Sequence, residues 1–308
     1  MISLIDNNSQ LEIMNFPDGE SFVKFDYNNK PINILWRYEN DAELMVLAQM
    51  YDVMKRVDQT SRMPKNLLIP YLPHARQDRE ATDNQPFSLK VLFNFLQSFS
   101  RGTNTSVFML DVHSFVFTNF LSIDAISSFL PKQSPMHNID SSHYSVHLKN
   151  EGYDVVICPD KGAEERADKW QYQLEGSDKS HEGLDDGIPR LDVVDFVQCT
   201  KTRDPSTGKL SDPSVIDVDV LSKAKKALLV DDIGTGFGTH VQLGNVLKKI
   251  NPDMQLDIFV THSSFTRGKE IVLDVFNKVY TTDSLPKGLL QVDDRIVRFN
   301  CTEFLPMV

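Results

Sequence analysis

The 308-residue sequence contains only three cysteines and no long apolar run. Cys158, Cys199 and Cys301 are far apart, so no CxxC pair indicates a zinc ribbon or a disulfide framework. No segment approaches the roughly 18 apolar residues of a membrane span, and the N-terminus lacks the charged and apolar regions of a signal peptide. These absences predict a protein of the reducing cytoplasm that has no membrane segment.

Positive charge is also scarce. Lys and Arg number 32 against 43 Asp and Glu, which gives a net charge of -11 and argues against a protein that grips nucleic acid over a broad basic face. Small anionic ligands stay compatible with this charge, because a few local cations and backbone amides are enough to bind them. The apolar fraction of 41% allows real cores, and the length suits two domains.

Apolar strands alternate with amphipathic helices along the chain. The spacing predicts helices over 41–59, 86–99, 238–250 and 269–277, and strands over 66–73, 105–113, 154–160, 226–232 and 255–262. This alternation predicts an α/β fold of two doubly wound, mostly parallel-sheet domains. Ligands of such sheets bind beyond the carboxyl ends of the strands, which selects the loops after Pro70, Leu110, Cys158 and Val230.

The stretch "VDDIGTGFGTH", residues 230–240, joins a strand to a helix through a glycine-rich turn. Such a turn forms a nest of backbone N–H groups that suits a phosphate. The two aspartates would repel a phosphate but suit hydrogen bonds from vicinal hydroxyls, so the pattern favours ribose 5-phosphate over a plain tight turn. The candidate ribose-phosphate residues are Asp231, Asp232, Gly234, Thr235, Gly236, Phe237, Gly238 and Thr239.

This stretch looks like the ribose-phosphate loop of type I phosphoribosyltransferase folds. "IPYLPHARQDRE", residues 69–80, is similar to the P-Y-x-P-Y-A-R-Q-D-R/K signature of ribose-phosphate pyrophosphokinases, the phosphoribosyl pyrophosphate (PRPP) synthetases. "FPDGE", "MLDVHS", "ICPDKGAEER" and "VTHSSF" resemble further blocks of that family, in the same order. The sequence is therefore identified as a divergent member, with an N-terminal domain over 1–143 plus about 292–308 and a C-terminal domain over 144–291.

The resemblance implies an enzyme that uses Mg²⁺ and moves the β,γ-diphosphate of ATP onto the C1 hydroxyl of ribose 5-phosphate, releasing AMP. It implies that an aromatic face and a guanidinium plane, those of Phe16 and Arg76, sandwich the adenine; an ordinary core aromatic is the alternative for Phe16. The family's N-terminal loop completes a neighbour's ATP site, so a homo-oligomer is expected, at least a dimer and usually a hexamer. The implied ATP-binding residues are Phe16, Asp18, Glu20, Arg76, Gln77 and Asp78.

The catalytic and metal positions also follow from the resemblance. Lys201 and Arg203 match the K-x-R of a flexible loop that closes over the reacting phosphates, where cations stabilise the developing charge. His113 and Asp160 match the family's metal-site positions. A carboxylate suits a hard Mg²⁺ ion, whereas His113 either ligates the metal or acts on the phosphate or a metal-bound water.

The sequence departs from the family around the acceptor. The usual loop is closer to D-D-[MI]-x-D-T-[AGC]-G-T, and here Thr235 replaces the third aspartate, Gly236 a threonine and Phe237 a small residue. Residues 79–86 have lost basic charge, and 171–190 contain extra polar material, predicted to be a surface loop. The plainer account keeps ribose 5-phosphate as the acceptor. The alternative is a 5′-extended ribose phosphate such as ADP-ribose, with Phe237 or the extra segment contacting the added group.

Three other classes of function fit the sequence less well. A non-catalytic regulatory homologue would tolerate the loss of Lys201, Arg203, His113 or Asp160, yet all four are present. A phosphoribosyltransferase that consumes PRPP predicts one catalytic domain and no A-R-Q-D block, and a nucleotide sensor needs no K-x-R loop. Release of AMP from ATP in the presence of an acceptor separates the enzyme from the regulator and the sensor.

Overall fold

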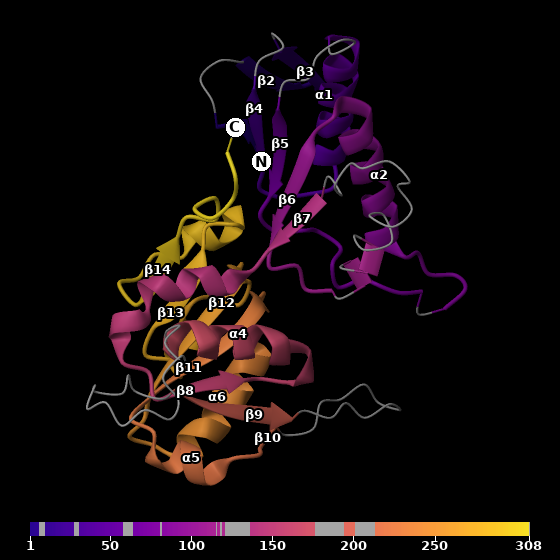
Figure 1. Cartoon of the computed structure of the whole chain (residues 1–308). Coiled ribbons are helices and arrows are strands. Elements are labelled where there is room, and N and C mark those ends of the chain that lie inside the picture. Colours follow the sequence, from indigo (N-terminus) through magenta and orange to yellow (C-terminus); the bar gives the residue numbers. More distant parts are fainter. Residues whose placement is uncertain are drawn as a thin grey trace, which may run out of the picture. The chain divides into compact units, whose positions relative to one another are not determined.

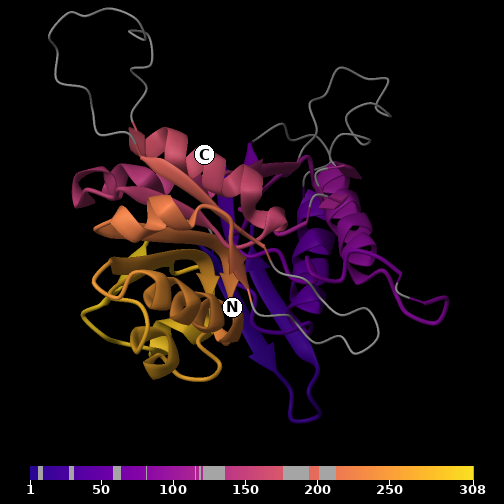
Figure 2. The same ribbon diagram turned by 90° about the horizontal axis from the view of Figure 1, so that it is seen from below.

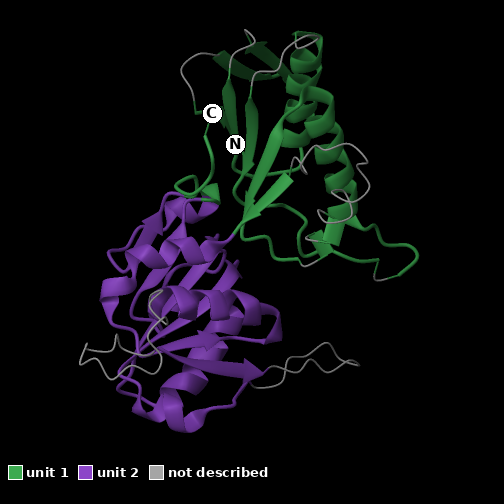
Figure 3. Cartoon of the chain, viewed as in Figure 1, with its two compact units in different colours: residues 1–139, 284–286, 301–308 green, residues 140–283, 287–300 purple. Residues whose placement is uncertain are grey.

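The computed structural model describes residues 1–5, 10–27, 31–57, 64–80, 82–114, 116–117, 119–120, 136–175, 194–200 and 213–307. The chain divides into two compact units (Figure 3): unit 1 comprises residues 1–139, 284–286 and 301–308, and unit 2 comprises 140–283 and 287–300. All three cysteines are buried and free of disulfides. No helix in the described part of the chain is long and apolar enough to cross a membrane.

Unit 1 contains a five-stranded sheet in the order β1-β4-β5-β6-β7, in which only β1 is antiparallel to its neighbour. A separate two-stranded hairpin, β2–β3, precedes the parallel strands, and the described part of the unit also contains the helices α1 and α2 (Figure 1). The elements of unit 1 are β1 (Ile2–Leu4), β2 (Gln10–Asn15), β3 (Ser21–Asp26), β4 (Ile32–Trp36), α1 (Glu43–Val57), β5 (Lys65–Ile69), α2 (Ser88–Thr103), β6 (Ser106–Leu110) and β7 (Met136–Ile139).

Alternating side chains give the first sheet two buried faces, as expected for parallel strands. Ile34 and Leu67 belong to the cluster that also contains the apolar faces of α1 and α2. Their neighbours Leu35 and Leu68 point the other way and pack with Leu305 of the C-terminal segment. The end of the chain therefore covers the face of this sheet that the two helices leave open.

Unit 2 contains a seven-stranded sheet in the order β10-β9-β8-β11-β12-β13-β14, parallel except for β10. Its elements are η1 (Ser141–His147), η2 (Lys149–Glu151), β8 (Val155–Cys158), η3 (Lys161–Ala163), α4 (Glu164–Glu175), β9 (Asp195–Thr200), β10 (Ser214–Val215), α5 (Val218–Lys223), β11 (Lys226–Gly234), α6 (Gly238–Ile250), β12 (Gln255–Ser263), α7 (Glu270–Leu273), β13 (Val279–Thr282) and β14 (Ile296–Phe299), with η5 (Pro286–Leu290) beginning in unit 1.

Helices cover both faces of the second sheet (Figures 1 and 2). On one face Trp170 of α4 packs on Phe259 of β12, with ring centroids 4.3 Å apart. On the other, Leu243 and Leu247 of α6 join Leu229 and Ile258 in one buried cluster. This is a doubly wound arrangement, and it confirms the fold class that the alternating pattern predicts.

The order of strands reverses at β8, because β9 lies on one side of it and β11 on the other. In open parallel sheets such a reversal leaves a crevice at the carboxyl ends of the two strands that diverge. Asp160 follows β8, and the Asp231–Asp232 pair lies near the carboxyl end of β11. The topology of unit 2 therefore brings these acidic residues to one edge of the sheet.

Three local expectations differ from the structure. The helix expected over 269–277 is only the short α7, because the chain turns back at Asn277, whose backbone N–H donates to Leu256 O at 2.8 Å, to enter β13. Residues 171–175 are the last turn of α4 rather than a loop. Finally, β14 pairs with β13 in unit 2, so 292–300 do not return to the first domain with the rest of 292–308.

Candidate active site

Backbone strain gathers at the carboxyl ends of the strands in both units. His74, Asp111, Phe237 and Phe265 have φ values of 60°, 45°, 54° and 47°, and they follow β5, β6, β11 and β12 respectively. Non-glycine residues rarely adopt this left-handed conformation, which costs of order 1–3 kcal/mol and is concentrated at functional sites. The strain marks the loops that the sheet topology selects for ligand binding.

Two side chains hold the aspartate pair at the end of β11. The Nε2 atom of buried His240, on the first turn of α6, lies 2.7 Å from Oδ2 of Asp231. Arg166 of α4 lies beside both carboxylates, with N–O distances of 4.0 Å to Asp231 and 3.9 Å to Asp232. The backbone N–H of Asp232 donates to Oδ1 of Asp231 at 2.9 Å. Two adjacent negative charges are thus oriented and partly neutralised by the protein.

The pKa of Asp231 reflects this surrounding. Burial by itself would raise it, but the hydrogen bond from His240 and the charges of His240 and Arg166 outweigh burial and lower the pKa to about 2. Asp231 is therefore ionised at neutral pH, which suits a group that accepts hydrogen bonds. The Nδ1 atom of His240 is buried and has no hydrogen-bond partner among the described residues.

The side chain of Phe237 points into the core and not out of the glycine-rich turn. Its side chain is 2% exposed and stacks on Phe265, with ring centroids 5.0 Å apart. A Cβ atom on Gly234 would lie only 2.4 Å from the Phe237 ring, so the glycine makes room for the aromatic side chain. The hypothesis that Phe237 contacts an extra group on the acceptor is wrong, because its ring lies in the core beneath the loop.

The remaining loop residues form the expected turn between strand and helix. Thr235 and Gly238 are exposed, Gly236 and Thr239 are half-buried, and α6 begins at Gly238. The helix N-terminus has no side-chain cap. Its first N–H groups have no intrahelical partner and carry the positive end of the helix dipole, which is the arrangement that binds phosphate.

The ATP-site residues implied by resemblance lie in two loops of unit 1. "FPDGE" forms the tight tip of the β2–β3 hairpin, where the backbone N–H groups of Phe16 and Gly19 close the turn. Phe16 is 50% exposed, so it is not the core aromatic of the alternative interpretation. Asp18 and Glu20, like Arg76 and Gln77 of the loop after β5, are also exposed.

The A-R-Q-D block contacts the block that follows β6. The hydroxyl of buried Ser114 donates to Oδ2 of Asp78 at 2.9 Å. Nearby, Nε2 of His74 pairs with Oδ1 of Asp41 at 2.9 Å. Asp78 therefore connects two neighbouring strand ends of unit 1, a positioning role that its sequence context did not reveal.

The two metal positions belong to different units. His113 is an exposed residue of unit 1, whereas Asp160 of unit 2 caps η3 and accepts the Gly162 N–H at 2.9 Å. No cluster of three or more His, Cys, Asp or Glu side chains suited to a metal ion occurs among the residues that the structure describes. Asp160 offers the oxygen ligand that Mg²⁺ prefers, and Mg²⁺ in phosphate-transfer sites is commonly held by one or two carboxylates and the substrate. The donor chemistry fits Mg²⁺ at Asp160.

Lys201 and Arg203 lie outside the described residues, as do 176–190 of the extra polar segment. The flanks of the basic loop are described. Ser214 pairs with Thr200 in the β9–β10 ladder, and their hydroxyl oxygens are 2.6 Å apart. The chain therefore leaves and rejoins the sheet at one point.

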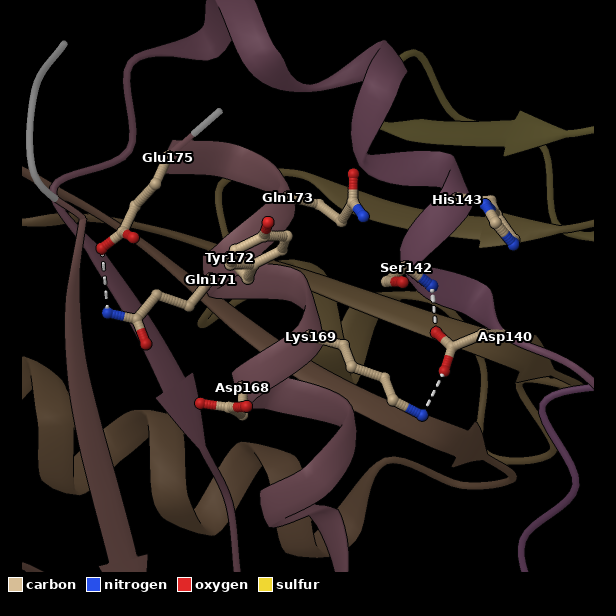
Figure 4. A pocket seen from close by; sticks show the side chains of 9 residues that line it. All are labelled: Asp140, Ser142, His143, Asp168, Lys169, Gln171, Tyr172, Gln173 and Glu175. Atoms are coloured by element: carbon tan, nitrogen blue, oxygen red, sulfur yellow. Dashed lines mark hydrogen bonds and ion pairs between the residues drawn. The ribbon is translucent and has the colours of Figure 1, made fainter. Parts of the chain in front are cut away.

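A separate hollow of about 450 Å³ lies on the surface of α4 (Figure 4). Lys169 crosses it to form an ion pair with Asp140 at 2.8 Å. Burial opposes ionisation of Asp140, but hydrogen bonds from Lys169 and Ser142 prevail and lower its pKa. The hollow is lined in part by residues of the extra polar segment, namely Gln171, Tyr172, Gln173 and Glu175, but by none of the site residues that the sequence predicts individually.

Sequence reasoning missed three side chains around the acceptor loop. Arg166 and His240 hold the aspartates, and Arg267, in the turn after β12, lies against Gly236 and Gly238. Arg166 and His240 stand inside the quoted motifs. A basic side chain so close to the predicted acidic residues was the signal that could have identified them. No pattern along the chain indicated Arg267, because the turn after β12 reaches the loop after β11 only through the pairing of the two strands.

Comparison with known proteins defines the class. The fold matches the crystal structure of phosphoribosylpyrophosphate synthetase from Mycobacterium smegmatis with a TM-score of 0.68 over 96% of this chain and 88% of that chain. At 19% sequence identity this likeness shows the fold alone. The chain is thus built of two α/β domains of the phosphoribosyltransferase type.

Sequence comparison identifies the family. Residues 5–99 match the N-terminal domain of ribose phosphate pyrophosphokinase. The ribose-phosphate pyrophosphokinase of Pyrococcus furiosus is 25% identical over 286 residues, covering 92% of this chain and 89% of that protein. That of Pyrococcus abyssi is 26% identical over 301 residues, covering 96% and 92%. The chain is thus similar to ribose-phosphate pyrophosphokinases over nearly its whole length, as the quoted motifs predict.

The contact between Gly234 and Phe237 predicts that substitutions at these two positions have non-additive effects on the free energy of unfolding. Gly234→Ala should lower the free energy of unfolding by about 1–3 kcal/mol through overpacking, and Phe237→Ala by about 3–5 kcal/mol through a cavity. The double variant should lose clearly less than the sum of the two, because each change makes room for the other. Urea unfolding of the four proteins measures this, and additive losses would contradict the packing role.

The pKa of Asp231 predicts an acid-sensitive contribution to stability. Because this pKa is about 2 in the folded chain and about 3.9 in an unfolded one, the ionised carboxylate stabilises the fold above pH about 4. The contribution is lost as the pH falls toward 2, and about 1 kcal/mol should be gone at pH 3. Asp231→Asn should remove this part of the pH dependence, whereas Asn at the exposed Asp253 should leave it. If the free energy of unfolding depends on pH in the same way for wild type and Asp231→Asn, the low pKa assigned to Asp231 is wrong.

Proposed function

We propose that the chain is a diphosphokinase that transfers the β,γ-diphosphate of ATP to the C1 hydroxyl of a ribose 5-phosphate unit. Ribose 5-phosphate is the simplest such acceptor, and the products are then PRPP and AMP. The proposal rests on the group of residues at the carboxyl end of β11 in unit 2. There an aspartate pair fixed by Arg166 and His240 stands next to a glycine loop at the N-terminus of α6.

The acceptor's sugar and phosphate would each meet suitable groups. Asp231 and Asp232 accept hydrogen bonds from the vicinal hydroxyls of the ribose, for which the low pKa of Asp231 keeps a full acceptor available. The N–H groups of the loop and of the first turn of α6 bind the 5′ phosphate.

In the transfer step the C1 oxygen attacks the β-phosphorus and the bond to the bridging α,β-oxygen breaks. AMP leaves with that oxygen, and the proton of the acceptor's hydroxyl is released to solvent. Lys201 and Arg203 stabilise the negative charge that develops on the phosphate oxygens, and loop closure excludes water. Asp160 would hold Mg²⁺, which when bound neutralises charge on the triphosphate, and His113 would act at that metal or at the phosphates.

Adenine binding is assigned to the two loops of unit 1. Phe16 and Arg76 enclose the base, and Asp18, Glu20, Gln77 and Asp78 act on the nucleotide. The exposed Phe16 side chain at the tip of a hairpin supports the proposal that a second subunit covers it, as in a dimer-based homo-oligomer. The cytoplasmic location stays a prediction.

A 5′-extended ribose phosphate such as ADP-ribose is the second candidate acceptor. Replacement of the loop's third aspartate by Thr235 removes a negative charge next to the phosphate site. The cation of Arg267, which lies against Gly236 and Gly238, favours additional negative charge on the acceptor.

The proposed activity predicts release of AMP from ATP and Mg²⁺ only when an acceptor is present. The assay follows AMP in parallel with ribose 5-phosphate, with ADP-ribose and with no acceptor. Lys201→Ala should reduce kcat at least about 100-fold with little change in ATP affinity, while Ala at the exposed Lys223 of α5 should leave turnover unchanged. Failure to release AMP with either acceptor refutes the enzyme, and near-normal turnover of Lys201→Ala refutes the role of that lysine.

A further inference from the structure

Arg267 lies across the glycines of the sugar-phosphate loop. A Cβ atom on Gly236 would be 3.3 Å from both Cγ and Cδ of Arg267, and one on Gly238 would be 3.2 Å from its Nη1. The side chain therefore runs from the turn before α6 to the first residue of that helix. A side chain at either glycine position would meet the arginine.

The backbone that carries Arg267 is fastened to the same loop. Thr266 donates two hydrogen bonds to the carbonyl oxygen of Thr235, from its backbone N–H at 2.7 Å and from its hydroxyl at 3.0 Å. The Ser264 N–H donates to the carbonyl of Gly234 at 3.2 Å. Phe265 also stacks on Phe237, so hydrogen bonds and ring packing join the two turns. These contacts hold the backbone of Arg267 beside the glycine-rich turn.

The charge of Arg267 is uncompensated within the described part of the chain. The residue is exposed and makes no hydrogen bond or ion pair with any residue in the described part of the chain. The neighbouring acidic side chain, that of Glu270, lies instead against Gly268. A Cβ atom on Gly268 would be 2.7 Å from Oε2 of Glu270. A cation beside a helix N-terminus meets a dipole end of its own sign. Both positive features are stabilised when an anion binds between or beside them.

We propose that Arg267 is a specificity-determining residue, which binds a second phosphoryl group joined to the acceptor's 5′ phosphate. The N–H groups and hydroxyls of the loop supply enough donors for one phosphate. Arg267 lies beside Gly236 and Gly238. Because these glycines have no side chains, they leave room for a second group attached to the 5′ phosphate. The inference rests on the proposed function and defines its acceptor as a ribose with a 5′ diphosphate, as in ADP-ribose.

Titration calorimetry on the full chain tests this directly. The probes are ADP-ribose and ribose 5-phosphate, each titrated in the presence of Mg²⁺ and a saturating non-hydrolysable ATP analogue, so that ADP-ribose is kept out of the nucleotide site. Arg267→Ala should weaken ADP-ribose binding at least about tenfold and ribose 5-phosphate binding less than about threefold. Arg267→Lys should recover part of the loss, because it restores the charge without the planar fork. Arg56→Ala, at an exposed arginine of α1, controls for the loss of one positive charge.

The outcomes separate this inference from the proposed function. An equal loss for both probes would overturn it, since Arg267 would then bind the first phosphate. No loss for either probe, or a wild type that binds ribose 5-phosphate but not ADP-ribose, would also overturn it while the diphosphokinase activity stands. If neither probe binds and neither supports AMP release, the proposed function fails together with the inference.

Discussion

Two adjacent carboxylates at the end of a buried strand repel each other, and unit 2 is arranged so that basic side chains lie beside them. Arg166 reaches Asp231 and Asp232 from α4, and His240 reaches Asp231 from α6, so helices on opposite faces of the sheet converge on one strand end. The reversal of strand order at β8 opens the crevice in which this is possible. Burial would otherwise neutralise such carboxylates, and a protonated pair would accept hydrogen bonds poorly.

Much of the fold was predictable because its signals are local. The helix over 238–250 is observed with the same bounds, and the buried strands at 226 and 255 begin where the apolar runs begin. The errors arose where tertiary contacts decide. The run after Lys269 has helical spacing, but Asn277 is drawn back to Leu256 at the start of the next strand. The strand at 296–299 stays in unit 2 because β13 offers a parallel edge, which no local pattern encodes.

The acceptor site shows the same division between local and tertiary information. The aspartate pair, the glycine turn and the helix start were visible in one short stretch, since a phosphate nest needs only contiguous backbone. The orientation of the Phe237 side chain could not be predicted from the sequence, because a phenylalanine in a glycine-rich loop is equally compatible with a ligand contact and with a place in the core. Its burial depends on Phe265, which comes from another loop, and on the absence of a side chain at Gly234.

Gly234 and Phe237 also restrict the order in which this loop was able to change during evolution. A Cβ at position 234 and the ring at 237 cannot occupy the same space, so the glycine had to precede the aromatic residue or appear together with it. Once the ring was in place, return of any side chain at 234 became unfavourable. Lineages that inherit the pair are therefore committed to this form of the loop. Their loops will differ letter by letter from the usual motif, although the glycine-rich turn between strand and helix is kept.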